Sequence, residues 1–234
     1  MGTEIQNLED INIFVLSGGF GTRLQSLVND KPKIMADING KPFIEYRIMQ
    51  IRKYFPNNKI YLLTHYLSEY IEKYFCNNDK IECIKENKPL GTGGSIKNAI
   101  KWLNLNKEAK ILVFNGDTYT DVNLSKLVAN AKCNITIVGC FHKKPIRFNT
   151  LQIENDKITG FLPKNSPNAT QYINCGCYYF QNTQCFDDIN LHNFSLEDQF
   201  KIFLDNEIIQ VFKYNDIFID IGTPEDYIKC KKLI

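Results

Sequence analysis

The sequence predicts an α/β protein whose central sheet is mainly parallel and covered by helices on both faces. Short apolar runs alternate with helical patterns through the first half of the 234-residue chain. In the second half, strand patterns follow one another with little room for helices, which predicts a smaller β region there. No repeat, low-complexity tract or long linker divides the chain, so residues 1–234 are expected to form a single domain.

The individual elements follow from apolar periodicity and from turn and cap residues. Strands are expected at 11–17, 59–64, 80–84, 111–115, 135–141, 149–153, 157–162, 172–180, 208–214 and 217–219. Helices are expected at 42–54, 68–75, 92–103, 195–205 and from 224 to the end. Pro56 ends the first helix, and Ser68 is expected to cap the second. The Asn155-Asp156 pair predicts a hairpin turn.

The C-terminal end predicts a further strand pair and a capped helix. The strands at 208–214 and 217–219 are expected to pair with each other. Thr223 is expected to be the N-cap of the last helix, with Pro224 at the first helical position and Glu225 in the first turn.

Composition excludes several classes of partner. The 28 basic and 26 acidic residues give a net charge of +2, so no global field favours a nucleic acid or an anionic membrane. No apolar run reaches the roughly 20 residues of a membrane-spanning helix, and no signal peptide is recognised, so a cytoplasmic protein is expected. The eight cysteines lack redox or zinc-binding spacing and are expected to be reduced and mostly buried.

The strongest motif, Leu-Ser-Gly-Gly-Phe-Gly-Thr-Arg-Leu at 16–24, follows the first predicted strand. Its glycines allow the backbone N–H groups to approach a phosphate closely. Arg23 can bind a phosphate bidentately, and Lys33 supplies a second cation. An ordinary strand-to-helix turn is the alternative for the glycines alone, and the two cations that follow argue against it.

This segment resembles the signature of the sugar-1-phosphate nucleotidyltransferases, LAGGxGTRL followed by a Pro-Lys pair, with Ser17 in place of the commoner alanine. Further blocks resemble the family in the same order. They are Asn39-Gly40-Lys41-Pro42, Glu86 with Pro89-Leu90-Gly91-Thr92-Gly93-Gly94, Asn115-Gly116-Asp117, Ile173-Asn174-Cys175-Gly176, Ser195-Leu196-Glu197 and Asp220-Ile221-Gly222-Thr223-Pro224. The resemblance covers nearly the whole chain. It implies a Rossmann-like mixed sheet with a sugar-binding region in the C-terminal half.

The resemblance also implies a reaction and its residues. In this family a sugar 1-phosphate attacks the α-phosphorus of an NTP in line, which requires alignment and charge neutralisation more than a protein nucleophile. The implied catalytic residues are Arg23, Lys33 and Asp117. The implied nucleotide-binding residues are Leu16, Gly18, Gly19, Gly21, Thr22, Arg23, Lys33, Glu86, Pro89, Gly91, Gly94 and Asp117. The implied sugar-binding residues are Lys164, Asn174, Gly176 and Glu197.

Two features at these positions leave alternatives open. Many family members have Glu-Lys where this chain has Pro163-Lys164, so the acidic neighbour of the lysine is absent here. Glu197 can also act simply as an acidic residue in the first turn of a helix.

A magnesium site is expected from Asp117 and Asp220, each of which follows a predicted strand. Mg²⁺ takes few protein carboxylates together with phosphate oxygens and water, and the resemblance places both residues at metal-binding positions. The alternative is that Asp117 is only a turn residue and Asp220 only a cap.

Glu86 makes guanine the expected base, because a carboxylate can accept from both N1–H and the 2-amino group. The alternative is a surface ion pair with Lys85 or Lys88. The chain length, the Glu86 block and the ending at 218–227 resemble D-glycero-D-manno-heptose 1-phosphate guanylyltransferases most. Mannose 1-phosphate guanylyltransferase, or a hexose 1-phosphate uridylyl-, thymidylyl- or cytidylyltransferase, is the nearest alternative.

Two readings from other classes are weaker. A regulatory subunit that binds a nucleotide sugar without turnover is disfavoured because the catalytic cations and carboxylates are retained together. An NAD-binding domain is disfavoured because the loop departs from G-x-G-x-x-G. The partners expected are an NTP, a sugar 1-phosphate and Mg²⁺, with no nucleic acid or membrane, and a homodimer is compatible with the sequence. No role is assigned to His65, His142 or His192.

Overall fold

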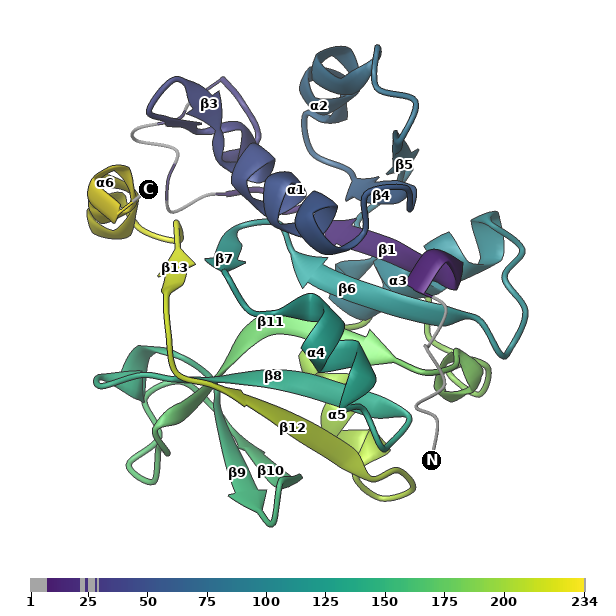
Figure 1. Ribbon diagram of the computed structural model, residues 1–234, viewed down its shortest axis with the longest axis vertical. Helices are drawn as coiled ribbons and strands as arrows, with labels where there is room; N and C mark the ends of the chain where they lie inside the picture. Colours follow the sequence, from purple (N-terminus) through teal and green to yellow (C-terminus); the bar gives the residue numbers. More distant parts are fainter. Residues whose placement is uncertain (1–7, 22–23, 25–27, 29, 234) are drawn as a thin grey trace.

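The computed structural model describes residues 8–21, 24, 28 and 30–233. A nine-stranded sheet runs through the molecule in the order β5-β4-β1-β6-β11-β8-β12-β10-β9 (Figure 1). Its strands are β1 Ile11–Leu16, β4 Ile60–Thr64, β5 Ile81–Lys85, β6 Lys110–Asn115, β8 Ile135–Phe141, β9 Thr150–Glu154, β10 Lys157–Leu162, β11 Tyr172–Phe180 and β12 Ile209–Tyr214. Two short ribbons lie outside it, β2 (Asp37–Ile38) with β3 (Lys41–Pro42), and β7 (Thr118–Thr120) with β13 (Phe218–Asp220).

Parallel pairing is concentrated in the N-terminal half. β5, β4, β1 and β6 are parallel neighbours, and β12 lies parallel to β8. β11 is antiparallel to both β6 and β8, and the β9–β10 hairpin continues the sheet antiparallel to β12. The sheet is therefore mixed, as expected, but parallel pairing does not extend through it. Parallel neighbours need crossover connections, and the second half has few helices to supply them.

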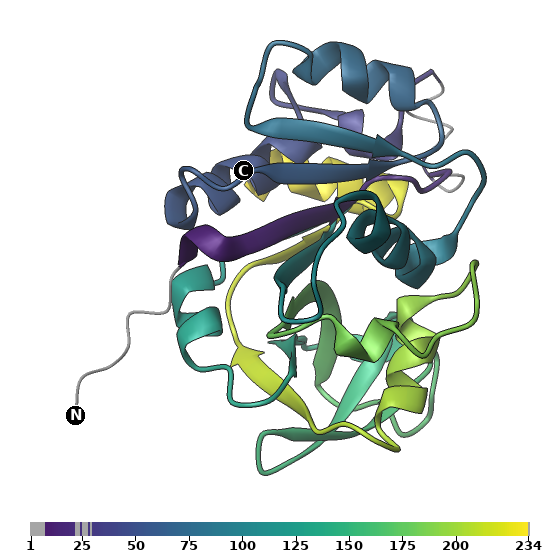
Figure 2. The same cartoon turned by 90° about the vertical axis from the view of Figure 1, so that its right-hand side faces the viewer.

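Helices cover both faces of the sheet. They are α1 Phe43–Tyr54, α2 Ser68–Phe75, α3 Gly91–Trp102, α4 Leu124–Ala129 and α5 Leu196–Phe203, whereas α6 Pro224–Leu233 packs on β13 instead. Side chains of β1 alternate between the faces, so Ile13 joins the core under α1, α2 and α4, whereas Phe14 joins the core under α3 and α5. Helices α3 and α5 lie side by side (Figure 2).

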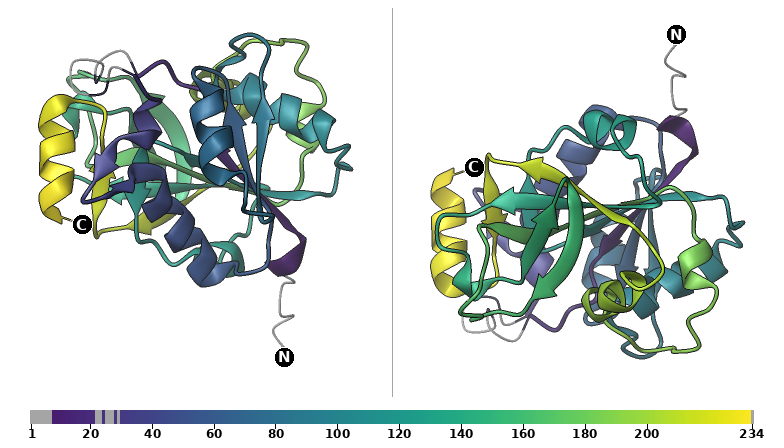
Figure 3. Two further views of the ribbon diagram at one scale, coloured as in Figure 1. Left: turned by 90° about the horizontal axis from the view of Figure 1, so that it is seen from above. Right: turned by 90° about the horizontal axis from the view of Figure 1, so that it is seen from below.

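The C-terminal helix α6 closes a small third cluster at one side of the molecule (Figure 3). Cys230 packs there with Ile38 and Ile221, and the Tyr227 hydroxyl donates to the Asp37 carbonyl at 2.6 Å. The helix begins as expected, because Thr223 Oγ1 accepts from the Asp226 N–H at 3.2 Å. This cluster fixes β13, which carries Asp220, and the segment that follows it.

Several sequence expectations are confirmed, and two are wrong. Asn155 and Asp156 have φ values of 50° and 62°, as a tight hairpin turn requires. Ser68 is not the N-cap of α2, because it is the first helical residue and makes no capping hydrogen bond, while Leu67 precedes it in the left-handed region. The strands at 208–214 and 217–219 do not pair with each other. β12 pairs with β8, and β13 pairs with β7, which the sequence pattern missed.

The cysteines are reduced, as expected, but only half of them are buried rather than most. All eight cysteines are free, and four of them are buried: Cys140, Cys175, Cys177 and Cys230. Burial raises the pKa of Cys177 to about 12, so this thiol stays protonated at neutral pH. Among the described residues, no helix combines the length and the apolar character that crossing a membrane requires.

Candidate functional site

A cavity of about 300 Å³ lies where the parallel strands β1, β4, β5 and β6 end. Ligands of open α/β sheets bind at this edge, because the loops that follow the strands converge there. Eight of the residues expected to bind the nucleotide line it: Leu16, Gly18, Gly19, Lys33, Glu86, Pro89, Gly91 and Asp117. We call it the nucleotide cavity.

A second cavity, of about 140 Å³, adjoins the first on the side of the C-terminal β region. We call it the sugar cavity. Three of the four residues expected to bind the sugar line it, namely Lys164, Asn174 and Glu197, and Asp220 lines it as well. Asn115 and Asp117 line both cavities. The end of β6 is therefore the junction of the two.

Two of the expected site residues that line neither cavity, Gly21 and Gly176, lie against residues that do. Gly21 has a φ of 61°, and a Cβ there would lie 2.8 Å from the Lys33 Cβ. Gly176 has a φ of 76°, and a Cβ there would lie 2.5 Å from the Asn115 Cγ. Both glycines thus allow a close approach to a cavity side chain. Thr22 and Arg23 lie outside the described residues.

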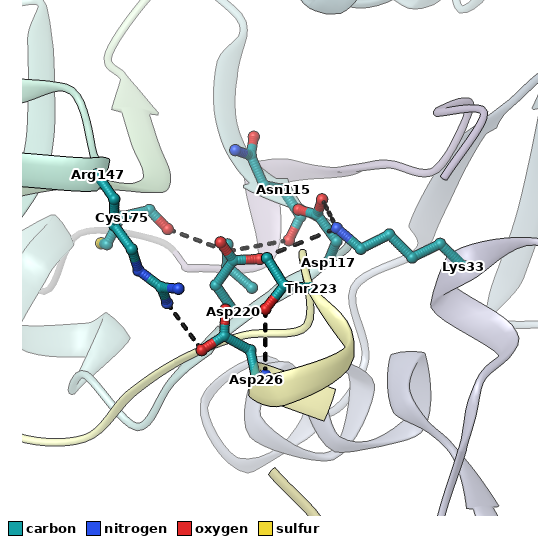
Figure 4. A network of polar contacts seen from close by, with 9 residues as sticks. Lys33, Asn115, Asp117, Arg147, Cys175, Asp220, Thr223 and Asp226 are labelled. Atoms are coloured by element: carbon teal, nitrogen blue, oxygen red, sulfur yellow. Dashed lines mark hydrogen bonds and ion pairs between the residues drawn. The ribbon is translucent and has the colours of Figure 1, made fainter. Parts of the chain in front are cut away.

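Lys33, Asp117 and Asp220 meet at the junction (Figure 4). The Lys33 ammonium lies 2.7 Å from Asp117 Oδ2 and 3.9 Å from Asp220 Oδ1, and its side chain is only 11% exposed. Asp220 reaches this point because β13 pairs with β7, which sets Asp220 opposite Thr118. Burial raises the pKa of the Asp220 carboxyl, and the Asp117 carboxylate raises it further, while Lys33 opposes both effects.

The donor set fits a magnesium ion. The carboxylates of Asp117 and Asp220 supply hard oxygen ligands around the Lys33 ammonium, and a divalent cation would relieve their repulsion. No group of three or more ligating His, Cys, Asp or Glu side chains occurs in the part of the chain that the structure describes. That is compatible with Mg²⁺, which usually takes one or two carboxylates and completes its shell with phosphate oxygens and water.

A buried arginine stabilises the turn that carries Asp117. Arg47 of α1 is fully buried and donates to the Thr118 carbonyl at 2.7 Å and to the Gln50 side chain. Its guanidinium lies 4.8 Å from the centroid of the Phe114 ring. Because no carboxylate pairs with it among the described residues, its charge is met by carbonyl oxygens and aromatic faces. Sequence patterns gave no signal for this residue.

An ion pair at the surface fixes the segment that follows Asp220. Arg147, in the connection between β8 and β9, lies 2.8 Å from Asp226 Oδ1 in the first turn of α6 (Figure 4). Asp226 Oδ2 accepts from the Thr223 hydroxyl at 2.9 Å. The segment that follows Asp220 is thereby anchored to the β region that forms the sugar cavity.

Glu86 lies in the nucleotide cavity and makes no ion pair with any residue that the structure describes. Its carboxylate accepts from the Leu90 N–H at 3.2 Å and from the Ser95 hydroxyl, and the side chain is buried. Burial raises the pKa of Glu86, and these two hydrogen bonds oppose the rise. The alternative of an ion pair with Lys85 or Lys88 is therefore wrong.

The glycines after Pro89, of which Gly91 and Gly94 are expected to bind the nucleotide, lie against another segment of the chain. Residues 91–102 form α3, and its first turns pack against residues 192–194. A Cβ at Gly91 would lie 2.5 Å from the Phe194 carbonyl oxygen, and one at Gly94 would lie 2.5 Å from that of His192. A Cβ at Gly93 would collide with the Phe194 ring. These glycines admit the segment that leads to α5.

The position of Glu197 is compatible with both interpretations that the sequence left open. It lies in the first turn of α5, whose N-cap is Ser195, and it lines the sugar cavity. Its Oε2 accepts from the Thr92 hydroxyl at 2.9 Å. Tyr178 lies in the same cavity, and burial and the nearby Glu197 carboxylate raise its pKa well above the ordinary value. Its hydroxyl is therefore neutral at physiological pH.

Some residues of the site carried no role in the sequence interpretation. His65, Thr92 and Ser95 line the nucleotide cavity, Tyr178 lines the sugar cavity and Asn115 lines both. The Asn115 Oδ1 and Tyr178 Oη atoms are buried without a hydrogen-bond partner among the described residues. Buried polar atoms of this kind are candidates for ligand contacts. Asn115 and Thr92 gave a signal, as members of the Asn-Gly-Asp block and of the block that follows Glu86.

Known proteins resemble this chain over almost all of its length. The family model described as nucleotidyl transferase matches residues 13–234. The chain is 35% identical over 217 residues to D-glycero-alpha-D-manno-heptose 1-phosphate guanylyltransferase of Campylobacter jejuni, with 91% of this chain and 95% of that protein covered. It is 34% identical over 229 residues to the protein of that name from Aneurinibacillus thermoaerophilus, with 93% and 96% covered.

A solved structure agrees with this similarity. The crystal structure of HddC from Yersinia pseudotuberculosis complexed with GMP-PN matches with a TM-score of 0.78 and 33% identity, covering 95% of this chain and 99% of that one. The match of sequence and fold extends through both cavities. The chain belongs to the nucleotidyl transferase family, as its glycine-rich motif predicted.

Proposed function

We propose that this protein transfers a GMP unit from GTP to a sugar 1-phosphate, with D-glycero-D-manno-heptose 1-phosphate as its substrate. A phosphate oxygen of the sugar attacks the α-phosphorus of GTP, the bond from that phosphorus to the bridging oxygen breaks, and pyrophosphate leaves. The products are the GDP-sugar and pyrophosphate.

The observation that carries the proposal is the pair of cavities that share Asn115 and Asp117. A direct transfer needs its two substrates in adjacent sites, with the reacting phosphates at the junction. Lys33 lies at that junction, where a cation can neutralise charge on the phosphates. The sugar phosphate needs no general base, because a phosphate dianion is already a nucleophile.

Guanine and heptose are supported by two different observations. Glu86 offers carboxylate oxygens in a buried position, and each oxygen retains a second lone pair beyond its bond to Leu90 or Ser95. The two curated relatives described above are heptose 1-phosphate guanylyltransferases, and the similar crystal structure holds GMP-PN. Asn174, Glu197 and Tyr178 supply polar groups for the sugar hydroxyls.

Asp117 and Asp220 would hold the magnesium ion, which on binding neutralises phosphate charge and orients the triphosphate. Lys33 then remains to pair with the phosphates. Arg23 is proposed as a further phosphate-binding cation from its place in the motif.

Pyrophosphate release over a grid of nucleotides and sugar 1-phosphates tests the proposal. The grid contains GTP, ATP, UTP, dTTP and CTP against the 1-phosphates of D-glycero-D-manno-heptose, mannose and glucose. GTP with the heptose 1-phosphate should give the highest kcat/KM. A higher value with mannose 1-phosphate would correct the sugar, and preference for a pyrimidine nucleotide would overturn the base. No turnover anywhere, with GDP-sugar still bound, would identify a regulatory subunit.

A further inference from the structure

The two cavities are connected at a second point, away from the reacting phosphates. Thr92, in the first turn of α3, lines the nucleotide cavity, and Glu197, in the first turn of α5, lines the sugar cavity. The Thr92 hydroxyl donates to Glu197 Oε2 at 2.9 Å, although 105 residues separate them in the chain. A hydrogen bond to an ionised carboxylate is among the stronger ones in proteins.

The direction of this hydrogen bond is fixed by the backbone of α5. The Leu196 N–H donates to Thr92 Oγ1 at 2.8 Å, so this oxygen already accepts one bond, and its single proton points to Glu197. The Ser195 hydroxyl donates to the same Glu197 oxygen at 3.1 Å. Among the described residues, no hydrogen bond reaches the other oxygen, Oε1. One oxygen thus anchors the side chain, and the other is available to a sugar hydroxyl.

The same two segments are also joined through their backbones. The Leu90 carbonyl accepts from the Phe194 N–H at 3.0 Å, and the Phe194 carbonyl accepts from the Gly93 N–H at 3.0 Å. On the nucleotide side, the Leu90 N–H donates to the Glu86 carboxylate. If nucleotide binding shifts residues 90–93, the start of α5 must move with them. If it holds residues 90–93 in place, the start of α5 is held as well.

We propose that Thr92 is a positioning residue that holds Glu197 in place for the sugar and couples the two cavities. The inference rests on the proposed function, because it needs a nucleotide in one cavity and a sugar 1-phosphate in the other. A ligand that fixes residues 90–93 removes part of the entropy cost of fixing Glu197. Each substrate therefore raises the affinity of the other, and by the same factor.

Thr92→Val removes the hydroxyl and keeps the size, whereas Thr92→Ser keeps the hydroxyl. Thr92→Val should raise the KM for the sugar 1-phosphate by about tenfold or more, which is the scale of a lost charge-assisted hydrogen bond, and change the affinity for GTP in the absence of the sugar 1-phosphate less than about threefold. Thr92→Ser should restore most of the loss. Thr183→Val is the matched control, because the buried Thr183 hydroxyl donates only to the Asn106 and Lys107 carbonyls and lines neither cavity.

Calorimetry gives the coupling directly. Binding of the sugar 1-phosphate is measured with and without a GTP analogue that cannot be cleaved between its α- and β-phosphates. In the wild-type protein the analogue should tighten sugar binding by a factor of about 5 or more, as is typical of coupled sites, and in Thr92→Val the factor should fall toward one.

An unchanged coupling factor in Thr92→Val, or a Thr92→Ser variant as impaired as Thr92→Val, would overturn the inference. A wild-type protein without turnover on any sugar 1-phosphate would instead contradict the proposed function. Because the comparison can use whichever sugar 1-phosphate the wild-type protein turns over, the two failures are distinguishable.

Discussion

The Lys33 ammonium lies 2.7 Å from one oxygen of Asp117 and 3.9 Å from one oxygen of Asp220, at the junction of the two cavities. It neutralises two carboxylates that would otherwise repel each other. The same position lets it pair with phosphate oxygens once a cation occupies the carboxylates. The first three predictions follow from this arrangement.

Lys33→Ala should lower kcat/KM by at least about 100-fold, because a donor directed at developing phosphate charge typically contributes that much. Steady-state kinetics with GTP and the sugar 1-phosphate measure it. Lys31→Ala is the control, since Lys31 is exposed and two residues away. Arg23→Ala, at a position outside the described residues, is expected to have an effect of similar size from its place in the motif. A loss of stability with unchanged kinetics would make these cations structural.

Asp117→Asn and Asp220→Asn should each abolish turnover at ordinary Mg²⁺ concentrations, since each variant loses one charged metal ligand. Titration of activity with Mg²⁺ should give half-saturation at a much higher concentration in both variants. Circular dichroism melting checks that the fold is kept. Near-normal activity of both variants at low Mg²⁺ would remove the metal assignment.

The raised pKa of Asp220 predicts that Asp220→Asn, although it abolishes turnover, stabilises the folded protein. A carboxyl whose pKa is higher in the folded than in the unfolded state binds more protons when folded, so it destabilises the folded protein once pH exceeds the unfolded value. Without Mg²⁺ at pH 7, Asp220→Asn should therefore melt a few degrees above the wild-type protein. The difference should shrink as pH falls through the pKa of Asp220. Thermal melts from pH 7 down to pH 4 measure it, and a lower melting temperature for the variant at pH 7 would contradict the prediction.

Glu86 should determine the choice of base. GTP should exceed UTP, dTTP and CTP by orders of magnitude in kcat/KM, because a base without guanine's adjacent donors leaves the buried carboxylate unpaired. ITP, which lacks the 2-amino group, should fall between. Glu86→Gln replaces one acceptor with a donor, so it should reduce the preference for GTP more than it slows the best pyrimidine substrate. A wild-type preference for any pyrimidine nucleotide would refute this role.

Gly93→Ala should destabilise the protein, although helix propensity alone predicts a gain of about 1 kcal/mol for glycine to alanine. The added methyl group would collide with the Phe194 ring, so the 192–194 segment would have to move. Urea unfolding measures the sign. Gly19→Ala is a stability control, since a Cβ there would meet nothing within 4 Å. An increase in the free energy of unfolding for Gly93→Ala would contradict the prediction, because it would show that the Phe194 ring moves aside at little cost.

Much of this protein could be read from local sequence patterns. Apolar periodicity located the strands of the main sheet, and the Asn155-Asp156 turn and the Thr223 cap were predicted from single residues whose conformations depend on near neighbours. The glycine-rich motif predicted the family, because a backbone that approaches phosphates closely restricts its own sequence.

The tertiary structure decided what those patterns could not. Asp220 meets Lys33 and Asp117 only because β13 pairs with β7 rather than with β12, and Thr92 meets Glu197 across 105 residues. Arg47 stabilises the Asp117 turn, although the sequence predicted only that it lies in a helix. Local propensities depend on a few adjacent residues, whereas these contacts depend on which distant strands pair and which helix faces pack together. The sequence by itself therefore determined the elements and the family, and the packing of the whole chain determined which side chains share a site.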